Sequence, residues 1–448
     1  MIVQGEVYKK RRACETASTA IHAGPAVKGE KLVRTSIRPL AYPFCLQAMD
    51  TFPTIILKPG EADRILGGHP WVYDSSIIRA VTPPIDGELV QVKDHRQRTL
   101  GVGFYNSASR IRVRMLAPDR FVPDQAFFEQ RIRAALDVRR RALPHATSFR
   151  VVNAESDLLS GLIVDKYDDV LVVQTSSLGM DRRKDLIVAA LRTVLSPRAI
   201  LERNDIGSRK FEGLPEVNGV LFGEAPDQVE ILLNGLKFRA PVGGGHKTGV
   251  YLDQQVNYAL VAERAKGARV LDCFTFLGGF ALHAARAGAL SVHGLDQSSA
   301  AVAAATDNAQ RNGLADRCTF EEANVFDWFK THTFTPPHER MVPKYDLIVL
   351  DPPSFTRNRQ SVPDAIRGYK EIHVRALKLL KPGGTLATFC CSHHVDGRLF
   401  EDVVLAAAFD QRRLLRRVAT YSQSADHPIL PAIPETEYLK GFAYELVR

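Results

Sequence analysis

The feature that most constrains this chain is an alternation of apolar runs and helical stretches from about residue 245 onward. The runs are continuously apolar, which is typical of strands buried on both faces of a parallel sheet. They are V-L-D at 270, V-H-G-L-D at 292, Y-D-L-I-V-L-D at 345 and T-L-A-T-F at 385. A helical stretch follows each run, so residues 241–448 are predicted to form a doubly wound α/β domain.

Two further segments precede this domain. Short strands separated by Pro, Gly and Asp turns run from residue 54 to about 117, which predicts a small β-barrel domain over 49–125. Residues 126–240 mix strands and helices, with a helix from Asp124 to about Leu143 and a hairpin centred on Asn234-Gly235. This mixture predicts an α+β middle domain.

Composition limits the location and the partners of the protein. The six cysteines contain no C-x-x-C pair, which favours reduced thiols in a cytoplasm, and no apolar stretch is long enough for a membrane span. More than half of the net charge of +9 falls in residues 1–48, which lack periodic patterning and are expected to be a disordered extension. The remaining charge is compatible with a local RNA-binding face.

The loop after the first strand of the α/β domain has the sequence D-C-F-T-F-L-G-G at 272. Its glycines allow the backbone to approach a ligand at the carboxyl edge of the sheet. The dinucleotide fingerprint G-x-G-x-x-G is absent, so a pyrophosphate cradle is poorly supported. The loop suits a ligand that has no diphosphate.

Two polar residues extend this predicted ligand site. Asp296 ends the second strand, where a carboxylate can accept hydrogen bonds from both ribose hydroxyls; the alternative is a capping role beside Ser298. Asn324 follows the next short strand and offers an amide to an adenine edge. Together they describe a nucleoside without a diphosphate, which fits S-adenosylmethionine better than NAD.

The strongest strand ends in D-P-P-S-F at 351. A polar residue followed by two prolines makes a rigid turn that can present Asp351 to the polar atoms of a flipped base. The alternative is that the prolines only end the strand.

Cys390 and Cys391 end the following strand and reach the same edge. Side chains alternate along a strand, so only one of the two thiols can face a substrate as a nucleophile. A buried structural role is the ordinary alternative for cysteine. His393 and His394 have no third ligand at suitable spacing, so no metal site is predicted.

Three arginines alternate along a strand of the predicted barrel. Arg110, Arg112 and Arg114 would place their guanidinium groups on one face, either against RNA phosphates or in solvent.

Many spaced motifs resemble one family. They include C-F-T-F-L-G-G-F at 273, V-F-D-W at 325, D-P-P-S-F at 351, R-G-Y-K-E-I at 367, T-F-C-C-S at 388, A-D-H-P at 425, Y-L-K-G-F at 438 and H-K-T-G-V-Y-L-D-Q-Q at 246. From about residue 54 onward the chain resembles the class I methyltransferases with an N-terminal PUA domain that make 5-methylcytosine in large-subunit ribosomal RNA.

The resemblance implies a PUA barrel, a middle domain and a Rossmann-like methyltransferase domain that uses S-adenosyl-L-methionine. It implies large-subunit ribosomal RNA as partner, a cytoplasmic location and a possible homodimer. The implied cofactor-binding residues are Asp272, Phe274, Gly278, Gly279, Asp296, Asn324, Asp351, Tyr251 and Gln254. Asn324 departs from the acidic residue that is usual in the family.

The resemblance also assigns the reaction. The family has Ser then Cys in T-F-C-C-S, which makes Cys391 the nucleophile and Cys390 the departure. The Cys391 thiolate would add to carbon 6 of cytosine so that carbon 5 accepts a methyl group, with Asp351 contacting the base. The alternatives are methylation at a base nitrogen or another carbon of RNA, a non-catalytic RNA-binding assembly factor and, third, a nicotinamide oxidoreductase.

Overall fold

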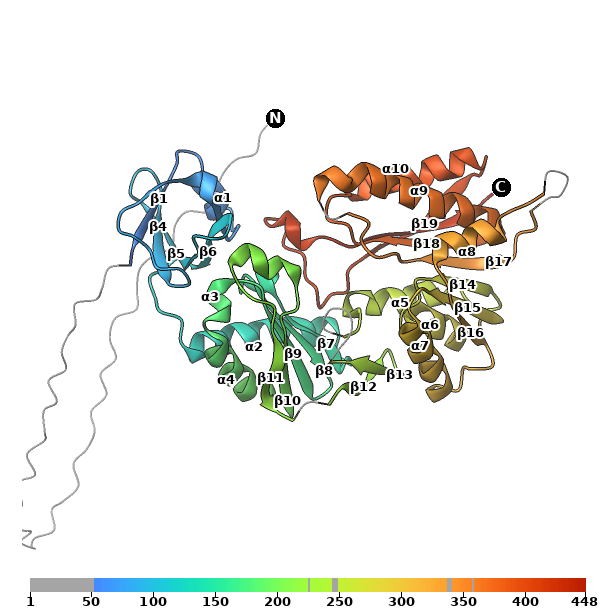
Figure 1. Cartoon of the computed structure of the whole chain (residues 1–448), viewed down its shortest axis with the longest axis horizontal. Helices are drawn as coiled ribbons and strands as arrows, with labels where there is room; N and C mark the ends of the chain where they lie inside the picture. Colours follow the sequence, from blue (N-terminus) through green and yellow to red (C-terminus); the bar gives the residue numbers. More distant parts are fainter. Residues whose placement is uncertain (1–51, 225, 244–248, 337–340, 357) are drawn as a thin grey trace, which may run out of the picture. The chain divides into compact units, whose positions relative to one another are not determined.

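The computed structural model describes residues 52–448 except 225, 244–248, 337–340 and 357. The expected extension over 1–48 lies outside the described residues. The described part contains four β-sheets, of six, five, two and seven strands (Figure 1). No helix in it is long and apolar enough to cross a membrane.

The first sheet is the predicted barrel. Its strands are β1 (Thr54–Leu57), β2 (Trp71–Tyr73), β3 (Ile77–Ala80), β4 (Leu89–Lys93), β5 (Thr99–Tyr105) and β6 (Ile111–Ala117), and helix α1 (Ala62–Leu66) follows β1. The strand order is β2-β6-β5-β4-β1-β3. Alternate residues such as Val90, Val92 and Val113 are fully buried and form its core. The five predicted strands are confirmed, and β3 is an addition.

The second sheet is five-stranded, with the order β11-β10-β9-β8-β7. Its strands are β7 (Ser148–Asn153), β8 (Leu162–Tyr167), β9 (Val170–Thr175), β10 (Ala199–Arg203) and β11 (Asn218–Gly223). The helices of this part of the chain are α2 (Gln125–Ala142), α3 (Leu178–Asp181) and α4 (Lys184–Leu195). Asp124 caps α2 by accepting a hydrogen bond from the Phe127 backbone, and Phe128, Ile132 and Leu136 bury its apolar face, so the predicted helix is confirmed.

The largest sheet has seven strands, in the order β16-β15-β14-β17-β18-β20-β19. Its strands are β14 (Arg269–Cys273), β15 (Ser291–Asp296), β16 (Cys318–Glu322), β17 (Tyr345–Leu350), β18 (Leu380–Cys390), β19 (Leu415–Ser422) and β20 (Lys440–Leu446). Strands β14 to β18 run parallel to one another, whereas β20 pairs antiparallel with both β18 and β19. The predicted doubly wound sheet is confirmed.

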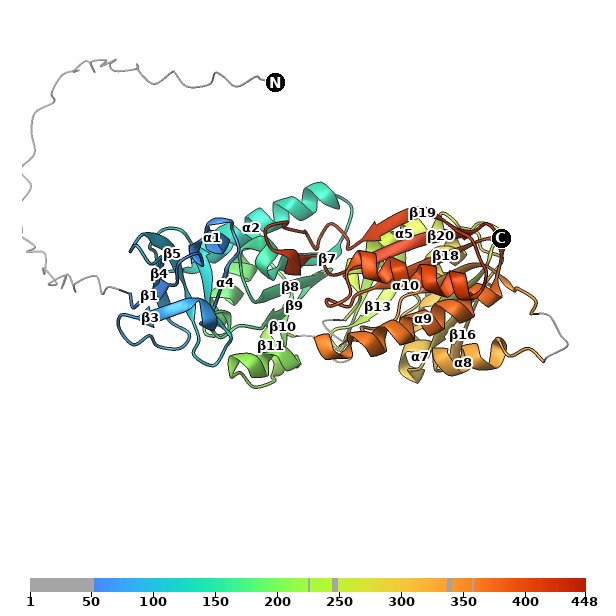
Figure 2. The same ribbon diagram turned by 90° about the horizontal axis from the view of Figure 1, so that it is seen from above.

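Helices cover both faces of this sheet. They are α5 (Gln255–Ala262), α6 (Gly279–Arg286), α7 (Ser299–Arg311), α8 (Val325–His332), α9 (Val362–Leu379) and α10 (Gly397–Asp410). One apolar core joins the sheet to α5, α6 and α7, and a second joins it to α8, α9 and α10. Helices α9 and α10 lie side by side in both views (Figures 1 and 2).

The predicted hairpin forms, and it contacts elements on both sides of it in the chain. Strands β12 (Gln228–Leu233) and β13 (Leu236–Pro241) meet at Asn234 and Gly235, whose φ angles of 50° and 83° fit a tight hairpin turn. Asn308 of α7 accepts a hydrogen bond from the Arg239 backbone. The apolar residues of the hairpin share one core with helix α6 and with strands β8, β9 and β10 of the five-stranded sheet. Strand β12 also contacts β7 and β8, so the hairpin packs against both parts of the chain.

Candidate active site

A cavity of about 560 Å³ lies at the carboxyl edge of the seven-stranded sheet. The loops after β14, β15, β17 and β18 line it, together with residues before α5 and the segment that leads into β20. Ligands of open α/β sheets bind at this edge. The predicted residues in its wall are Tyr251, Gln254, Phe274, Gly279, Asp296, Asn324, Asp351 and Cys391.

Asp272 lies outside the cavity wall, beneath the loop that follows β14. Its Oδ2 accepts hydrogen bonds from the Thr275 hydroxyl at 2.6 Å and the Ala281 backbone at 3.0 Å. Its side chain is fully buried, which raises its pKa to about 7. Asp272 therefore shapes the loop, which differs from the direct cofactor contact that the resemblance implied.

The raised pKa of Asp272 makes stability depend on pH. In the unfolded chain this carboxyl titrates near pH 4, so between about pH 4 and pH 7 the folded protein binds more protons than the unfolded one. Stability therefore falls as pH rises through this window. We expect the Tm of Asp272→Asn to drop less than that of the unmodified protein between pH 5 and pH 8, measured by thermal unfolding without cofactor. Equal drops would contradict the buried neutral carboxyl.

The loop after β14 has an unusual backbone conformation. Phe274 and Phe276 have φ angles of 66° and 49°, which non-glycine residues rarely adopt. Gly278 follows at 84° and lies outside the cavity wall. The Phe276 backbone donates a 2.9 Å hydrogen bond to Asp296, which holds the strained loop against the end of β15.

Both oxygens of Asp296 are engaged by backbone groups. Oδ2 accepts from Phe276 and Oδ1 accepts from the Ser298 backbone at 2.9 Å. Ser298 itself caps α7 by accepting from Ala301. Each carboxylate oxygen has a second lone pair, so Asp296 is held in place and can still accept hydrogen bonds from a ribose.

Asn324 has a structural role that the sequence analysis missed. It caps α8, because its Oδ1 accepts from the backbones of Phe326 at 3.0 Å and Asp327 at 3.3 Å. Its amide nitrogen is therefore the atom that can contact an adenine, by donating a hydrogen bond.

The acceptor end of the cavity holds Asp351 and Cys391. Gln254 donates a 3.0 Å hydrogen bond to Asp351 and is itself fixed by Asn257. The sulfur of Cys391 lies 4.0 Å from the carbonyl oxygen of Pro352. Cys391 lines the cavity, so both side chains that could touch a base share one wall.

The two neighbouring thiols point in different directions. Cys390 is fully buried, and its sulfur lies 3.4 Å from the Tyr369 hydroxyl, in the core beneath α9. Cys391 is partly exposed. Strand alternation had predicted that only one thiol could face a substrate.

The residues of the cavity wall that sequence reasoning missed include three with polar side chains, Asp253, His393 and Tyr438. The Tyr438 hydroxyl donates a 2.7 Å hydrogen bond to Asp253, 185 residues earlier in the chain. Tyr438 belongs to the Y-L-K-G-F motif and His393 follows the Cys-Cys pair, so both lay within stretches already noted.

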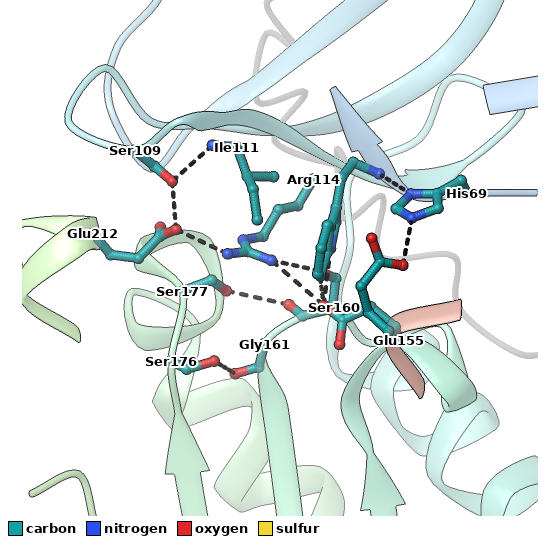
Figure 3. A network of polar contacts seen from close by, with 12 residues as sticks. His69, Ser109, Ile111, Arg114, Glu155, Ser160, Gly161, Ser176, Ser177 and Glu212 are labelled. Atoms are coloured by element: carbon teal, nitrogen blue, oxygen red, sulfur yellow. Dashed lines mark hydrogen bonds and ion pairs between the residues drawn. The ribbon is translucent and has the colours of Figure 1, made fainter. Parts of the chain in front are cut away.

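The three barrel arginines do not form one exposed face. Arg114 is only 13% exposed and forms ion pairs with Glu212 at 2.9 Å and Glu155 at 3.4 Å (Figure 3). Arg112 donates to the backbone carbonyl of Ser107. Arg110 is exposed. A phosphate role for Arg114 does not fit, because the carboxylates of Glu155 and Glu212 already occupy its guanidinium group.

Substitutions of Arg114 and Arg110 are expected to change different properties, stability for Arg114 and RNA binding for Arg110. Arg114→Met would leave the carboxylate of Glu212, which is only 5% exposed, without its cation and lower the free energy of unfolding by about 3 kcal/mol, measured by urea denaturation. Arg110→Gln should leave stability unchanged and weaken RNA binding, with a salt dependence reduced by about one phosphate contact. If the salt dependence of RNA binding is unchanged in Arg110→Gln, Arg110 makes no phosphate contact.

Comparisons with known proteins agree with this geometry. Residues 213–424 match a family model described as S-adenosylmethionine-dependent methyltransferase, and residues 55–118 match a PUA-like domain. The chain is 42% identical over 392 residues to a ribosomal RNA large subunit methyltransferase I of Shewanella amazonensis, covering 86% of this chain and 98% of that protein. The protein of the same name from Aeromonas hydrophila is 38% identical over 397 residues, covering 87% and 98%.

Solved structures show the same fold. A SAM-dependent methyltransferase of Streptococcus mutans is 21% identical, with a TM-score of 0.73 over 88% of this chain and 99% of that one. A methyltransferase crystallised with SAH is 22% identical, with a TM-score of 0.74 over the same shares. The expected fold class, a Rossmann-like methyltransferase domain preceded by a PUA-like domain, is confirmed.

Proposed function

Because the chain belongs to the S-adenosylmethionine-dependent ribosomal RNA large subunit methyltransferase I family, we propose that it methylates carbon 5 of a cytosine in large-subunit ribosomal RNA. The observation that carries this choice of atom is the position of Cys391. Its thiol lines the same cavity as Asp351. Asp351 and Cys391 follow the adjacent strands β17 and β18, whereas Asp296 ends β15, on the other side of β14. Carbon methylation of cytosine needs such a nucleophile, whereas methylation at a base nitrogen does not.

The residues of the cavity fit the cofactor. Asp296 offers lone pairs to the ribose, Asn324 offers an amide donor to the adenine, and the strained loop at Phe274 and Phe276 closes the apolar side. When bound, S-adenosylmethionine supplies a methyl group activated by its sulfonium. The chain's own residues then have to activate the base and hold it in place.

Activation of the base is the task of Cys391. Carbon 5 of cytosine is a poor nucleophile until the Cys391 thiolate adds to carbon 6, which makes carbon 5 enamine-like. Asp351 hydrogen-bonds the ring nitrogen or the amino group and stabilises the charge that develops during this addition. Gln254 orients Asp351 for the contact. Loss of the carbon 5 proton and departure of the thiolate restore the ring.

We expect the N-terminal barrel to contact the RNA. The PUA-like barrel carries Arg110 at its surface, immediately before β6, where it can contact a phosphate. The target base has to leave its stack to reach a cavity at the sheet edge. A homodimer stays a prediction, as does the cytoplasmic location.

Mapping modified nucleotides in ribosomal RNA tests the proposal. A strain that lacks the gene should lose one 5-methylcytosine from its large-subunit ribosomal RNA, measured by mass spectrometry of RNA fragments. The unmodified gene should restore the mark and a Cys391→Ala gene should not. If the strain instead loses a base that is methylated at a nitrogen, the chain methylates a base nitrogen. If the strain keeps all its methylated bases, the chain acts as an assembly factor without methyl transfer.

A further inference from the structure

The proposed reaction needs a general base, a side chain that accepts a proton, close to Cys391. After methyl transfer, carbon 5 carries both the new methyl group and its original hydrogen. The thiolate can leave only when a base takes that hydrogen as a proton. The base must reach the cavity, must be unprotonated near neutral pH and must pass its proton on afterwards.

The carboxylates of the cavity wall are poorly suited to this task. Each accepts at least one hydrogen bond from a neighbouring donor, and such bonds stabilise a carboxylate and make it a weaker base. The three are Asp253, bonded by Tyr438; Asp296, bonded by the backbones of Phe276 and Ser298; and Asp351, bonded by Gln254. The phenols of Tyr251 and Tyr438 keep their protons, because burial raises their pKa values.

His393 lies in the same wall, two residues after Cys391. The residue between them, Ser392, is fully buried, and its hydroxyl lies 2.9 Å from that of Tyr369 and 3.0 Å from that of Ser354. Ser392 thus faces the protein interior, while Cys391 and His393 both face the cavity.

The backbone around His393 is held in place. Lys440 of β20 donates to the carbonyl oxygens of Ser392 at 2.8 Å and Tyr438 at 2.9 Å, which ties the two segments together. The rings of His393 and Tyr438 consequently lie 5.7 Å apart, between centroids. Within the described part of the chain, the imidazole nitrogens of His393 form no hydrogen bond and are available to a substrate.

We propose that His393 is the base that removes the carbon 5 proton, which rests on the proposed cytosine chemistry. An imidazole nitrogen forms a bond to the proton, and the electron pair of the C5–H bond becomes the C5–C6 double bond. The C6–S bond breaks at the same time, and its electron pair leaves with the Cys391 thiolate. Because His393 is also exposed to solvent, the imidazolium then releases the proton to water.

The surroundings keep this imidazole neutral. Partial burial lowers the pKa of His393, and the nearby charges of Lys440 and His394 lower it further, while Glu435 acts in the opposite direction. A neutral imidazole can accept a proton at pH 7.

Trapping the covalent intermediate tests this assignment. His393→Gln should still add Cys391 to cytosine and transfer the methyl group, but should fail to release the product. With ordinary target RNA and S-adenosylmethionine it should accumulate a methylated, denaturation-resistant protein–RNA adduct, and its turnover should fall about a hundredfold. RNA labelled with tritium at carbon 5 should retain its label in this adduct. The matched control is His394→Gln, which changes the neighbouring imidazole but leaves the imidazole of His393, so it should turn over and accumulate no adduct on ordinary RNA.

Two results would overturn the assignment of His393. One is His393→Gln with unchanged turnover; the other is lost turnover without an adduct on ordinary cytosine, while RNA containing 5-fluorocytosine is still captured. Cofactor binding and the Tm of the variant show that it is folded. If the unmodified protein itself does not capture RNA that contains 5-fluorocytosine, the proposed methylation of cytosine at carbon 5 is wrong. That result is distinct from a failure of His393 as the proton acceptor.

Discussion

Replacing Cys391 with alanine is expected to lower methyl transfer by at least about a thousandfold. Removal of the thiol leaves nothing to add to carbon 6, so carbon 5 stays unreactive toward the methyl group. Cys391 is partly exposed in the cavity wall, so its loss leaves no cavity in the core and should not change the Tm. Affinity for S-adenosylmethionine, measured by titration calorimetry, should also stay unchanged.

Cys390→Ser is the matched control for Cys391→Ala. A serine hydroxyl at residue 390 can keep the contact that the thiol makes with the Tyr369 hydroxyl at 3.4 Å. Cys390 is turned into the core, so turnover should remain within about twofold of the original value. Residual activity in Cys391→Ala that disappears in a double variant with Cys390→Ser would show that Cys390 is the nucleophile.

Asp351→Asn is expected to lower kcat by about a hundredfold. The amide keeps the shape of the side chain and loses the negative charge that stabilises the activated base. Gln254, whose amide donates to Asp351 at 3.0 Å, can still orient one oxygen, so folding should be unaffected.

The two roles that the sequence suggested for Asp351 separate in this variant. A fall in kcat with unchanged affinity for S-adenosylmethionine assigns Asp351 to the target base. A loss of cofactor affinity that equals the loss of turnover would assign it to the cofactor instead. Asp364→Asn on α9 serves as control, because that carboxylate is exposed and outside the cavity wall.

Much of this site could be predicted because strand ends are visible in a sequence. Continuous apolar runs locate β14, β15, β17 and β18, and in a parallel sheet their carboxyl ends meet at one edge. Asp296, Asp351 and Cys391 were therefore expected to lie together, and the structure brings them into one cavity.

Residues whose surroundings depend on distant parts of the chain could not be placed in this way. Arg114 alternates with apolar residues like an exposed strand residue, but its partner Glu212 lies 98 residues later. Asp253 and Tyr438 meet across 185 residues. Local periodicity carries no information on such pairs, because folding of the whole chain brings them together. The cap role of Asn324, by contrast, is local and could have been predicted.

The proposed mechanism requires Cys391 to form a covalent bond with carbon 6 of the target cytosine. The most direct test incubates the unmodified protein with S-adenosylmethionine and target RNA that contains 5-fluorocytosine. Fluorine cannot leave carbon 5 as a proton does, so elimination should stall and a denaturation-resistant adduct should accumulate. Peptide mass mapping of this adduct should place the modified nucleotide on Cys391. An adduct on Cys390, or methylated RNA without any adduct, would contradict this mechanism.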